Sequence, residues 1–246
     1  MQITAVIPAR YGSTRFPGKP LASICGKTMI QRVYENARQC SLVGRVVVAT
    51  DSDEIARAVQ QFGGEVCMTS NMHETGTDRI AEAAQKLDAD LIVNVQGDEP
   101  LLQPQAIELA VKPLLINQQI SMGTLKAPIK SEQDIENPNI VKVVTDTSGR
   151  ALYFSRSAIP FVRSRQTDLI MYRHIGLYVY RRDFLLQLTG LPQSMLEKAE
   201  SLEQLRALEY GFCIHVAETG YEPISVDVPE DIVKVEHALR QQGRDL

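Results

Sequence analysis

Residues 3–21 read ITAVIPARYGSTRFPGKPL, a short apolar run followed by a loop with two glycines and three cationic side chains. The β-branched run Ile3–Ile7 predicts a buried strand. In an open α/β sheet, ligands bind at the carboxyl ends of the strands, so we expect the loop to lie at a binding edge. Glycines let the backbone approach a ligand, and Arg10, Arg15 and Lys19 supply charge for several phosphates. The loop therefore predicts a triphosphate cradle.

The loop matches neither of two common phosphate-binding motifs. A P-loop has four residues between its first glycine and a Gly-Lys pair, and then Ser or Thr. Here five residues separate Gly12 from Gly18, and Pro20 follows Lys19. The dinucleotide fingerprint G-x-G-x-x-G is also absent from the sequence. A surface turn with solvated cations is the alternative, but three cations held between Gly and Pro beside a strand end favour an anion site.

Composition sets limits on the class of protein. With 246 residues, 44% of them hydrophobic, the chain can bury one sizeable core, and we predict a single α/β domain over residues 1–246. The net charge of −4 provides no general attraction for nucleic acid. No apolar run approaches the roughly 18 residues that span a membrane, and no signal-peptide pattern is present. The four cysteines form no C-x-x-C pair, so we expect reduced thiols and a cytoplasmic location.

Strand and helix patterns alternate over residues 1–120. Short apolar runs, typical of buried parallel strands, occur at 3–7, 46–49, 66–68 and 91–95. Amphipathic helical patterns lie between them and begin at Thr28, at Asp51 or Ser52, at Asp78 and at Pro104. This alternation predicts a Rossmann-like, doubly wound, mostly parallel sheet.

The second half has a different pattern. Strands are expected at 121–127, 140–146, 150–154 and 172–181 with no helix between them, which predicts an inserted mixed sheet over about 125–180. The Arg- and Ser-rich stretch 155–169 predicts a flexible connection or lid. Helical patterns return near 184–188 and 201–210, a strand is expected at 213–217, and a short strand at 224–228 precedes a terminal helix from Pro229.

Two further motifs carry polar groups at expected strand or helix ends. Gln96-Gly97-Asp98-Glu99-Pro100 follows a strand and places a carboxylate where a divalent cation could bind. A turn in which Asp98 bonds its own backbone is the alternative. Thr75-Gly76-Thr77-Asp78-Arg79 opens a helix, with Thr77 or Asp78 as a possible cap. Capping does not explain Arg79, because the helix dipole disfavours a cation in the first turn, so we expect an anionic ligand nearby.

A fourth motif, Val226-Asp227-Val228-Pro229-Glu230-Asp231, supplies more carboxylates. Asp227 should end the short strand and could face Asp98 across the site. Asp231 fits the first turn of the terminal helix, where the dipole favours an acidic side chain. One or two carboxylates, completed by phosphate oxygens and water, are the ligands that Mg²⁺ prefers.

Together these segments resemble the sugar-activating cytidylyltransferases, and most closely those that act on 3-deoxy-D-manno-octulosonate (KDO), an eight-carbon keto acid sugar. The resemblance runs in order along nearly the whole chain. Besides the first loop, it rests on V-V-V-A-T-D at 46–51, T-G-T-D-R at 75–79, N-V-Q-G-D-E-P at 94–100, Y-F-S-R-S at 153–157, Ile159-Pro160, H-I-G-L-Y-V-Y at 174–180, L-E-Q-L-R at 202–206 and V-D-V-P-E-D at 226–231. Thr75 departs from the serine common in the family but keeps the hydroxyl.

The resemblance implies a role for each matched residue. Triphosphate contacts would come from Arg10, Arg15 and Lys19, and cytidine contacts from Ala9, Thr75 and Thr77. Arg79 and Gln96 would lie where nucleotide and sugar meet. The sugar would contact Arg156, His174, Tyr178, Glu203 and Gln204, and Asp98 and Asp227 would hold Mg²⁺. Without the family match, His174 and Tyr178 could face solvent, and Glu203 and Gln204 could be an ordinary solvated helix face.

The implied reaction is transfer of CMP from CTP to the anomeric hydroxyl of KDO, with release of pyrophosphate, in lipopolysaccharide synthesis. Lys19, Arg15 and Asp98 would be the catalytic residues, with no covalent intermediate. The family likeness also implies a homodimer through residues 125–175, with no nucleic acid or membrane partner. Alternatives are a related ulosonic acid as substrate, a glycosyltransferase that uses Asp51-Ser52-Asp53 as a metal site, and a non-catalytic nucleotide sensor.

Overall fold

The computed structural model describes residues 1–12, 15–164 and 168–241. Ser13 and Thr14 of the first loop, and residues 165–167 of the expected connection, lie outside the described residues. The chain divides into two compact units: a first unit of Met1–Glu108 with Pro223–Leu246, and a second unit of Leu109–Glu222. That the two units form one domain stays a prediction. The expected insertion at 125–180 falls within the second unit, which extends beyond it on both sides.

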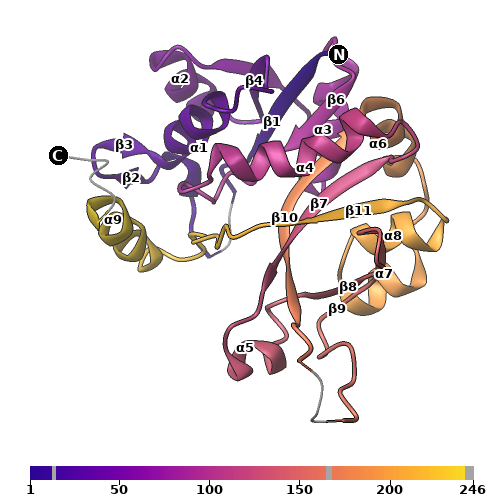
Figure 1. The fold of residues 1–246 in the computed structure, drawn as a ribbon. Helices are drawn as coiled ribbons and strands as arrows, with labels where there is room; N and C mark the ends of the chain where they lie inside the picture. Colours follow the sequence, from indigo (N-terminus) through magenta and orange to yellow (C-terminus); the bar gives the residue numbers. More distant parts are fainter. Residues whose placement is uncertain (13–14, 165–167, 242–246) are drawn as a thin grey trace. The chain divides into compact units, whose positions relative to one another are not determined.

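Four parallel strands organise the first unit (Figure 1). They are β1 (Ile3–Ala9), β4 (Arg45–Thr50), β5 (Glu65–Met68) and β6 (Leu91–Asn94), in the spatial order β6-β1-β4-β5. The four apolar runs of the sequence are therefore confirmed as strands. β1 has a neighbour on each side, and its residues are almost all buried. Because the strands are parallel, the loops that follow β1 and β6 leave the same edge of the sheet.

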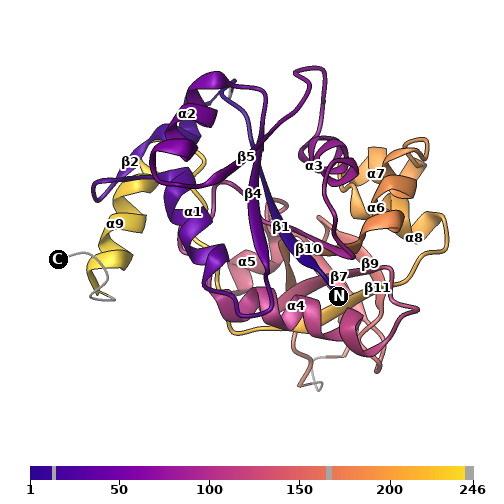
Figure 2. The ribbon, with the colours of Figure 1, turned by 90° about the horizontal axis from the view of Figure 1, so that it is seen from above.

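Three helices cover the first unit's sheet, and each begins with a hydroxyl cap. In α1 (Met29–Arg38) and α2 (Asp53–Gln61), the side chains of Thr28 and Ser52 accept from Gln31 and Ile55 backbone N–H groups, as the cap pattern predicts. The third helix, α3 (Gly76–Gln85), is capped by Thr75, so the predicted start at Asp78 was two residues late. Figure 2 shows α1 and α2 on one side of the strands and α3 on the other, which confirms the doubly wound arrangement.

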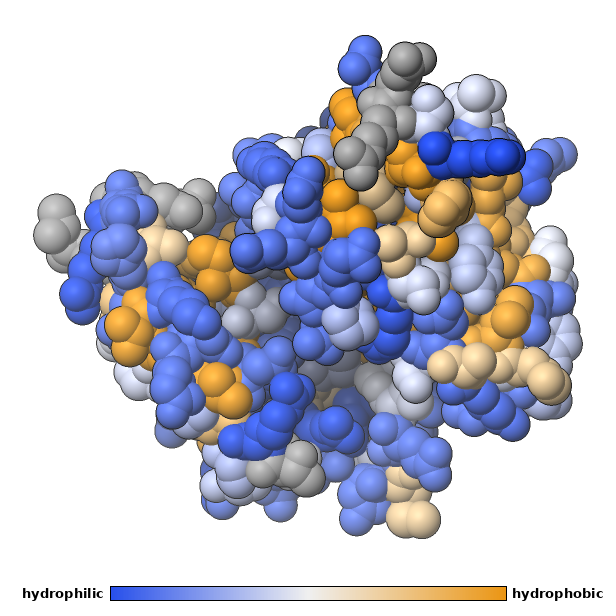
Figure 3. Space-filling model, turned by 90° about the horizontal axis from the view of Figure 1, so that it is seen from below, coloured by the Kyte–Doolittle hydropathy of each residue, from blue (hydrophilic) through white to orange (hydrophobic). Residues whose placement is uncertain are grey.

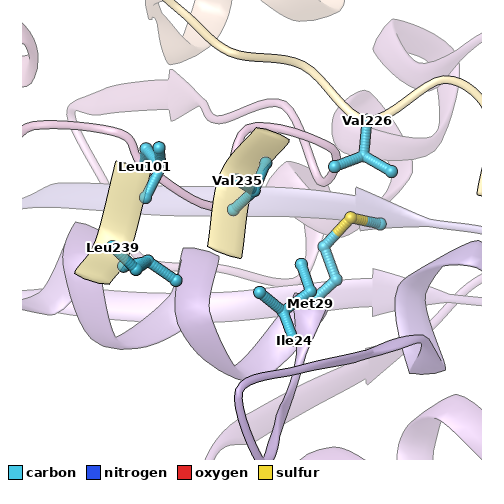
Figure 4. Packing of buried hydrophobic residues seen from close by; sticks show 6 residues of the cluster. All are labelled: Ile24, Met29, Leu101, Val226, Val235 and Leu239. Carbon is cyan, nitrogen blue, oxygen red and sulfur yellow. The ribbon is translucent and has the colours of Figure 1, made fainter. Parts of the chain in front are cut away.

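The end of the chain returns to the first unit through a small apolar cluster. The terminal helix α9 (Asp231–Gln241) packs on the hairpin of β2 (Ser23–Ile24) and β3 (Lys27–Thr28), next to the short helix η1 (Lys19–Leu21). Figure 4 shows the buried members of the cluster, which are Ile24, Met29, Leu101, Val226, Val235 and Leu239. The stretch 224–228 is not a strand, so its prediction as one was wrong. Its residue Val226 instead packs in this cluster.

The second unit has the mixed sheet that the sequence predicts. It begins within α4 (Pro104–Ile116), whose first-turn proline is as expected. Strand β7 (Met122–Pro128) pairs antiparallel with β10 (Tyr172–Arg181) and parallel with β11 (Ile214–Glu218). Strands β8 (Lys142–Thr145) and β9 (Ala151–Ser155) form an antiparallel pair, and β8 also bonds β10.

Four helices lie wholly within the described part of the second unit, and two of them correct the sequence analysis. The helices α6 (Arg182–Thr189) and α8 (Gln204–Glu209) lie where helical patterns predict them. A short helix, α5 (Glu132–Glu136), lies between β7 and β8, where no helix was expected. The pattern also missed α7 (Met195–Glu200). Both are of one to two turns, too short for a hydrophobic period to be seen.

The surface and the cysteines fit the composition. Figure 3 shows one face of the molecule that is largely hydrophilic, with separate hydrophobic areas. Among the described residues, none of the helices has the length and apolar character that a membrane span requires. Cys25, Cys40, Cys67 and Cys213, all of them described, take part in no disulfide, as their wide spacing predicts.

The apolar cluster under α9 yields a stability prediction. Val235 is fully buried in this helix, whereas Val233 is 68% exposed on it. We expect Val235→Ala to lower the free energy of unfolding by about 2 kcal/mol, because it leaves a cavity. The matched control, Val233→Ala, should change it by less than about 0.5 kcal/mol. Urea denaturation measures both, and equal effects would contradict the packing of α9 described above.

Candidate active site

A cavity of about 270 Å³ lies in the first unit, at the edge where the loops after β1 and β6 emerge. It gathers residues from four separate segments: the first loop, the start of α3, the loop after β6 and the segment before α9. Of the predicted site residues, those lining it are Ala9, Arg10, Arg15, Lys19, Thr75, Arg79, Gln96, Asp98 and Asp227. Thr77 is buried in the first turn of α3 and is not among the lining residues.

Lys19 connects the carboxylates of this cavity. Its Nζ donates to Asp98 Oδ2 at 2.7 Å and to the Val226 carbonyl at 2.6 Å, and it lies 3.7 Å from Asp227 Oδ1. The left-handed backbone of Gly18 (φ 69°) precedes it and starts the short helix η1. The lysine side chain is only 15% exposed, so this ion pair is better shielded than a surface pair.

The segment that carries Asp227 is fixed at both ends. Val226 N–H donates to the Asp98 carbonyl at 3.0 Å. Asp231 accepts from the backbone N–H groups of Asp227 and Val228, and Lys234 and these N–H groups lower the pKa of Asp231 to about 2. Asp231 therefore orders the turn, as the helix start suggested. Arg15 adds a 3.0 Å bond to Asp227 Oδ1, but both side chains are at least half exposed, so this pair contributes little stability.

The two carboxylates fit a magnesium ion. Asp98 and Asp227 meet at one ammonium group, which shows that a single cation can contact oxygen atoms of both segments. In the described part of the chain, no group of three or more His, Cys, Asp or Glu side chains could hold a metal. A site with two protein carboxylates suits Mg²⁺, which keeps water and takes substrate phosphates as its other ligands.

The loops after β1 and β6 touch at Gly97. A Cβ atom at this position would lie 2.9 Å from the Pro8 carbonyl oxygen and 3.6 Å from Ile7 Cγ2. Contacts below 3.0 Å force the backbone to shift, so only glycine fits here without movement. The close approach places Gln96 and Asp98 beside the first loop.

Arg79 has a partner within the protein. Its guanidinium donates to Asp51 Oδ2 at 2.8 Å and to Thr69 Oγ1 at 2.6 Å, and the residue is only 3% exposed. Asp51 therefore supplies an anion for the cation in this first turn, so the position of Arg79 alone does not require the anionic ligand that the sequence predicts. The guanidinium still borders the cavity, and its contact with a ligand stays a prediction.

The ion pair between Arg79 and Asp51 argues against the alternative of a metal site at Asp51-Ser52-Asp53. Asp51 is bound by Arg79, and Ser52 caps α2. The cap of α3 also differs from the prediction, which named Thr77 or Asp78. Thr75 Oγ1 instead accepts from the Asp78 N–H and donates to its carboxylate at 2.8 Å.

His73 is a cavity residue that the sequence analysis missed, together with Pro8, Pro20, Gly76 and Gly97. Its Nε2 lies 2.6 Å from Glu82 Oε2. Lys86, the Ser70 N–H and His73 together lower the pKa of Glu82 to about 2. The signal that could have found His73 is its position two residues before the Thr75–Arg79 motif.

The predicted sugar-binding residues form a separate cluster in the second unit. Tyr178 OH donates to Gln204 Oε1 at 3.2 Å, and the Tyr178 and His174 rings lie 5.4 Å apart. The Nε2 atom of Gln204 is buried and has no partner in the described part of the chain. These side chains do not face open solvent as ordinary surface groups, since Phe154 also packs on His174.

Burial sets the charge of this cluster. It lowers the pKa of His174 to about 3 and, helped by the nearby Glu203 carboxylate, raises the pKa of Tyr178. Thr124 Oγ1 lies 2.9 Å from His174 Nε2 and 3.0 Å from the Ile175 carbonyl. Since the single hydroxyl proton goes to a carbonyl, His174 Nε2 carries the proton that binds Thr124. Both rings are neutral at pH 7.

Arg156 contacts backbone rather than the His174 ring. Its guanidinium donates to the carbonyls of Glu200 (2.7 Å), Pro138 (3.0 Å) and Ser201 (3.3 Å). The backbone N–H of Arg156 donates to the Glu200 carboxylate at 2.9 Å. These bonds tie the end of β9 to the end of α7, and a contact of Arg156 with sugar stays a prediction.

The doubly wound fold, with cations and carboxylates at the carboxyl edge of its sheet, defines a nucleotide-binding α/β protein of the nucleotidyltransferase type. A model of the cytidylyltransferase family matches residues 4–222. The chain belongs to the cytidylyltransferase family, which confirms the resemblance seen in its motifs.

Relatives and solved structures agree with this assignment. Two relatives named 3-deoxy-manno-octulosonate cytidylyltransferase come from Syntrophotalea carbinolica (58% identical, 98% of this chain and 99% of the relative) and Geobacter sulfurreducens (56%, 98% and 100%). A solved CMP:2-keto-3-deoxy-manno-octonic acid synthetase complexed with CTP is 44% identical, with a TM-score of 0.94 over 98% of this chain and 100% of that one. A cytidylyltransferase from Leptospira borgpetersenii, 18% identical with a TM-score of 0.67 over 98% and 87%, shares the fold.

The neutral His174 ring yields a pH prediction. Its pKa is about 3 in the folded protein against 6.5 ordinarily, so below pH 6.5 the unfolded chain binds a proton that the folded protein does not. The free energy of unfolding should therefore decrease as the pH is lowered. Between pH 7 and pH 5, this ring should account for about 1 to 2 kcal/mol of that decrease.

Denaturation of matched variants at both pH values measures this contribution. His174→Asn should lose that much less stability than the wild type on going from pH 7 to 5. His237→Asn, which replaces an exposed histidine of α9, should keep the wild-type slope. If His174→Asn keeps it as well, the ring is not held neutral by the fold.

Proposed function

We propose that this chain transfers CMP from CTP to the anomeric hydroxyl of KDO and releases pyrophosphate. The names of its relatives and the CTP bound to the solved synthetase support these substrates. The observation that carries the proposal is the meeting of Lys19 with Asp98 and Asp227 at the binding edge of the sheet. Such a site joins cations for a triphosphate to carboxylates for its metal.

In this proposal the first loop neutralises the nucleotide. Arg10 and Arg15 are exposed at the cavity and bind the triphosphate together with Lys19. Arg15 and Lys19 then stabilise the charge that develops on the leaving pyrophosphate, which is the main task of a protein in phosphoryl-type transfer. Ala9, Thr75 and Thr77 lie near the cytidine, with Arg79 and Gln96 towards the sugar.

We further propose that Asp98 and Asp227 hold Mg²⁺. When bound, this ion supplies charge for the α-phosphate and acidity for the attacking hydroxyl. Because the ammonium of Lys19 contacts the same oxygen atoms, we expect it to leave Asp98 for the phosphates when nucleotide and metal bind. Asp98 would then also accept the proton of the sugar hydroxyl.

The cluster in the second unit suits a sugar acid with many hydroxyls. His174, Tyr178, Glu203 and Gln204 offer neutral donors and one carboxylate, and the buried Nε2 of Gln204 is a donor with no protein partner in the described residues. A buried donor without a partner costs about 1 to 3 kcal/mol, a cost that a sugar hydroxyl or carboxylate would remove. Arg156, which bonds to the carbonyls of Glu200 and Ser201 at the end of α7, would also contact the sugar.

An assay of pyrophosphate release tests the function. With CTP and Mg²⁺, release should depend on added KDO and should be weaker with 8-amino-KDO or a sialic acid. Pyrophosphate release in the absence of a sugar would contradict the proposal. A lack of release with every one of these acids would contradict it as well. Preference for another of the acids would assign the enzyme to that ulosonic acid instead.

Removal of the metal ligands gives a sharper prediction. Asp98→Asn and Asp227→Asn should each lower kcat at least about 100-fold at saturating Mg²⁺, and should weaken Mn²⁺ binding in the presence of CTP, as measured by electron paramagnetic resonance. Asp183→Asn is the control, since this carboxylate is 96% exposed in the second unit. Near-normal turnover of Asp98→Asn would rule out its role in metal binding.

We also propose that the enzyme is a cytoplasmic homodimer. The free thiols support a reducing compartment. For the dimer, the support is a group of exposed hydrophobic side chains inside the predicted interface at 125–175. These are Leu152 (61% exposed), Phe161 (87%), Val162 (43%), Leu169 (47%) and Ile170 (56%). Exposed apolar side chains gathered in one segment are typical of protein–protein contacts.

Light scattering after gel filtration checks the dimer. We expect twice the chain mass for the wild type and the mass of one chain for the double variant Phe161→Ser, Ile170→Ser. Ile116→Ser, which replaces a side chain that is 85% exposed in α4, should leave the dimer intact. A monomeric wild type, or a dimer that survives the double substitution, would contradict this interface.

A further inference from the structure

His73 lies in the wall of the cavity, yet none of the roles above uses it. It enters from the segment before α3, next to Thr75 and Gly76, whereas the cations Arg10, Arg15 and Lys19 come from the first loop. Its side chain is 22% exposed, and its Nε2 is held by Glu82 at 2.6 Å. In the described part of the chain, Nε2 is the ring nitrogen that has a protein partner, and Nδ1 has none.

Glu82 fixes which ring nitrogen carries a proton. Its carboxylate also accepts from the Ser70 N–H at 2.8 Å and from Lys86 Nζ at 2.7 Å. These donors hold its pKa at about 2, so Glu82 is ionised at neutral pH and can only accept. The proton of a neutral His73 ring therefore lies on Nε2, and Nδ1 presents a lone pair.

The Nδ1 acceptor of His73 excludes the phosphates of the nucleotide as its hydrogen-bond partner. Ionised phosphate oxygens only accept hydrogen bonds, so they would face the Nδ1 lone pair unfavourably. A cytosine base offers a donor, its exocyclic amino group, where uracil has an oxygen atom that accepts. His73 and Thr75 line the cavity from another segment than the first-loop cations, which suits contact with the base rather than with the phosphates.

We propose that His73 Nδ1 accepts a hydrogen bond from the amino group of cytosine and so selects CTP over UTP, with Glu82 as the positioning residue. This inference rests on the proposed function for the identity of the nucleotide. Uracil would bring an oxygen lone pair against Nδ1, and a site whose polar group is left unpaired rejects the wrong substrate strongly.

Calorimetric binding of CTP and of UTP, without sugar, tests the proposal independently of turnover. His73→Leu should lower the ratio of CTP to UTP affinity at least about tenfold, the loss of one good hydrogen bond. His73→Asn should keep most of the ratio, because its amide oxygen can replace Nδ1. Glu82→Gln should lower the ratio, since its amide can donate to Nε2 and free the other tautomer. Lys86→Met, which removes a different partner of Glu82, is the control and should keep the ratio.

Other outcomes would overturn the proposal. Equal weakening of CTP and UTP by His73→Leu would assign His73 to the ribose, and an unchanged ratio with altered KDO dependence would assign it to the sugar. ¹⁵N chemical shifts of His73 that show a proton on Nδ1 would overturn the tautomer. Failure of the proposed function is a separate result, namely a wild type that binds CTP selectively but releases no pyrophosphate with KDO.

Discussion

The ammonium group of Lys19 is the interaction on which the site depends. It joins three segments that are far apart in the sequence: the first loop, the loop after β6 through Asp98, and the segment before α9 through the Val226 carbonyl. Its position follows from the parallel sheet, which brings the loops after β1 and β6 to one edge, and from the positive φ of Gly18. Without a cation at this point, Asp98 and Asp227 would leave two carboxylates close together, which is unfavourable.

The parts of the fold and site that were predictable are those with local causes. Apolar runs predicted the four parallel strands of the first unit but not the short hairpin of β2 and β3. Polar side chains before helical patterns predicted the cap at Thr28 and gave Ser52 as one of two candidates for α2. The approach of Asp227 to Asp98 was also predicted, but from a strand at 224–228 that the structure does not have; the bond from the Val226 N–H to the Asp98 carbonyl joins the two segments instead.

What could not be predicted depends on contacts between distant residues. Arg79 in a first turn pointed correctly to an anion, but the sequence could not show that Asp51, 28 residues earlier, supplies it. His73 is set apart by its bond to Glu82 and by the cavity beside it, neither of which leaves a local pattern. In the same way, the backbone bonds of Arg156 depend on where α7 ends, and α7 itself was too short to detect.

Long cationic side chains in the second unit bond backbone carbonyl groups. Lys142 is fully buried and donates to the carbonyls of Asn137 (2.9 Å) and Arg156 (2.5 Å), and burial lowers its pKa. Arg181 donates to the carbonyls of Leu114 and Ile120 at 2.8 and 2.9 Å. These side chains satisfy carbonyl groups that no strand or helix would pair, and so hold irregular segments in one conformation. In the first unit, Lys19 makes one such bond to the Val226 carbonyl, but it also pairs with Asp98 and borders the cavity together with Arg15.

The contact between Gly97 and the Pro8 carbonyl has a consequence for how such chains can diverge. A side chain at 97 cannot be accepted unless the first loop moves, and that loop carries the cations of the cavity. A substitution at 97 is therefore coupled to the backbone at Pro8. An experimenter who wishes to place a side chain at 97 must redesign the start of the first loop together with it.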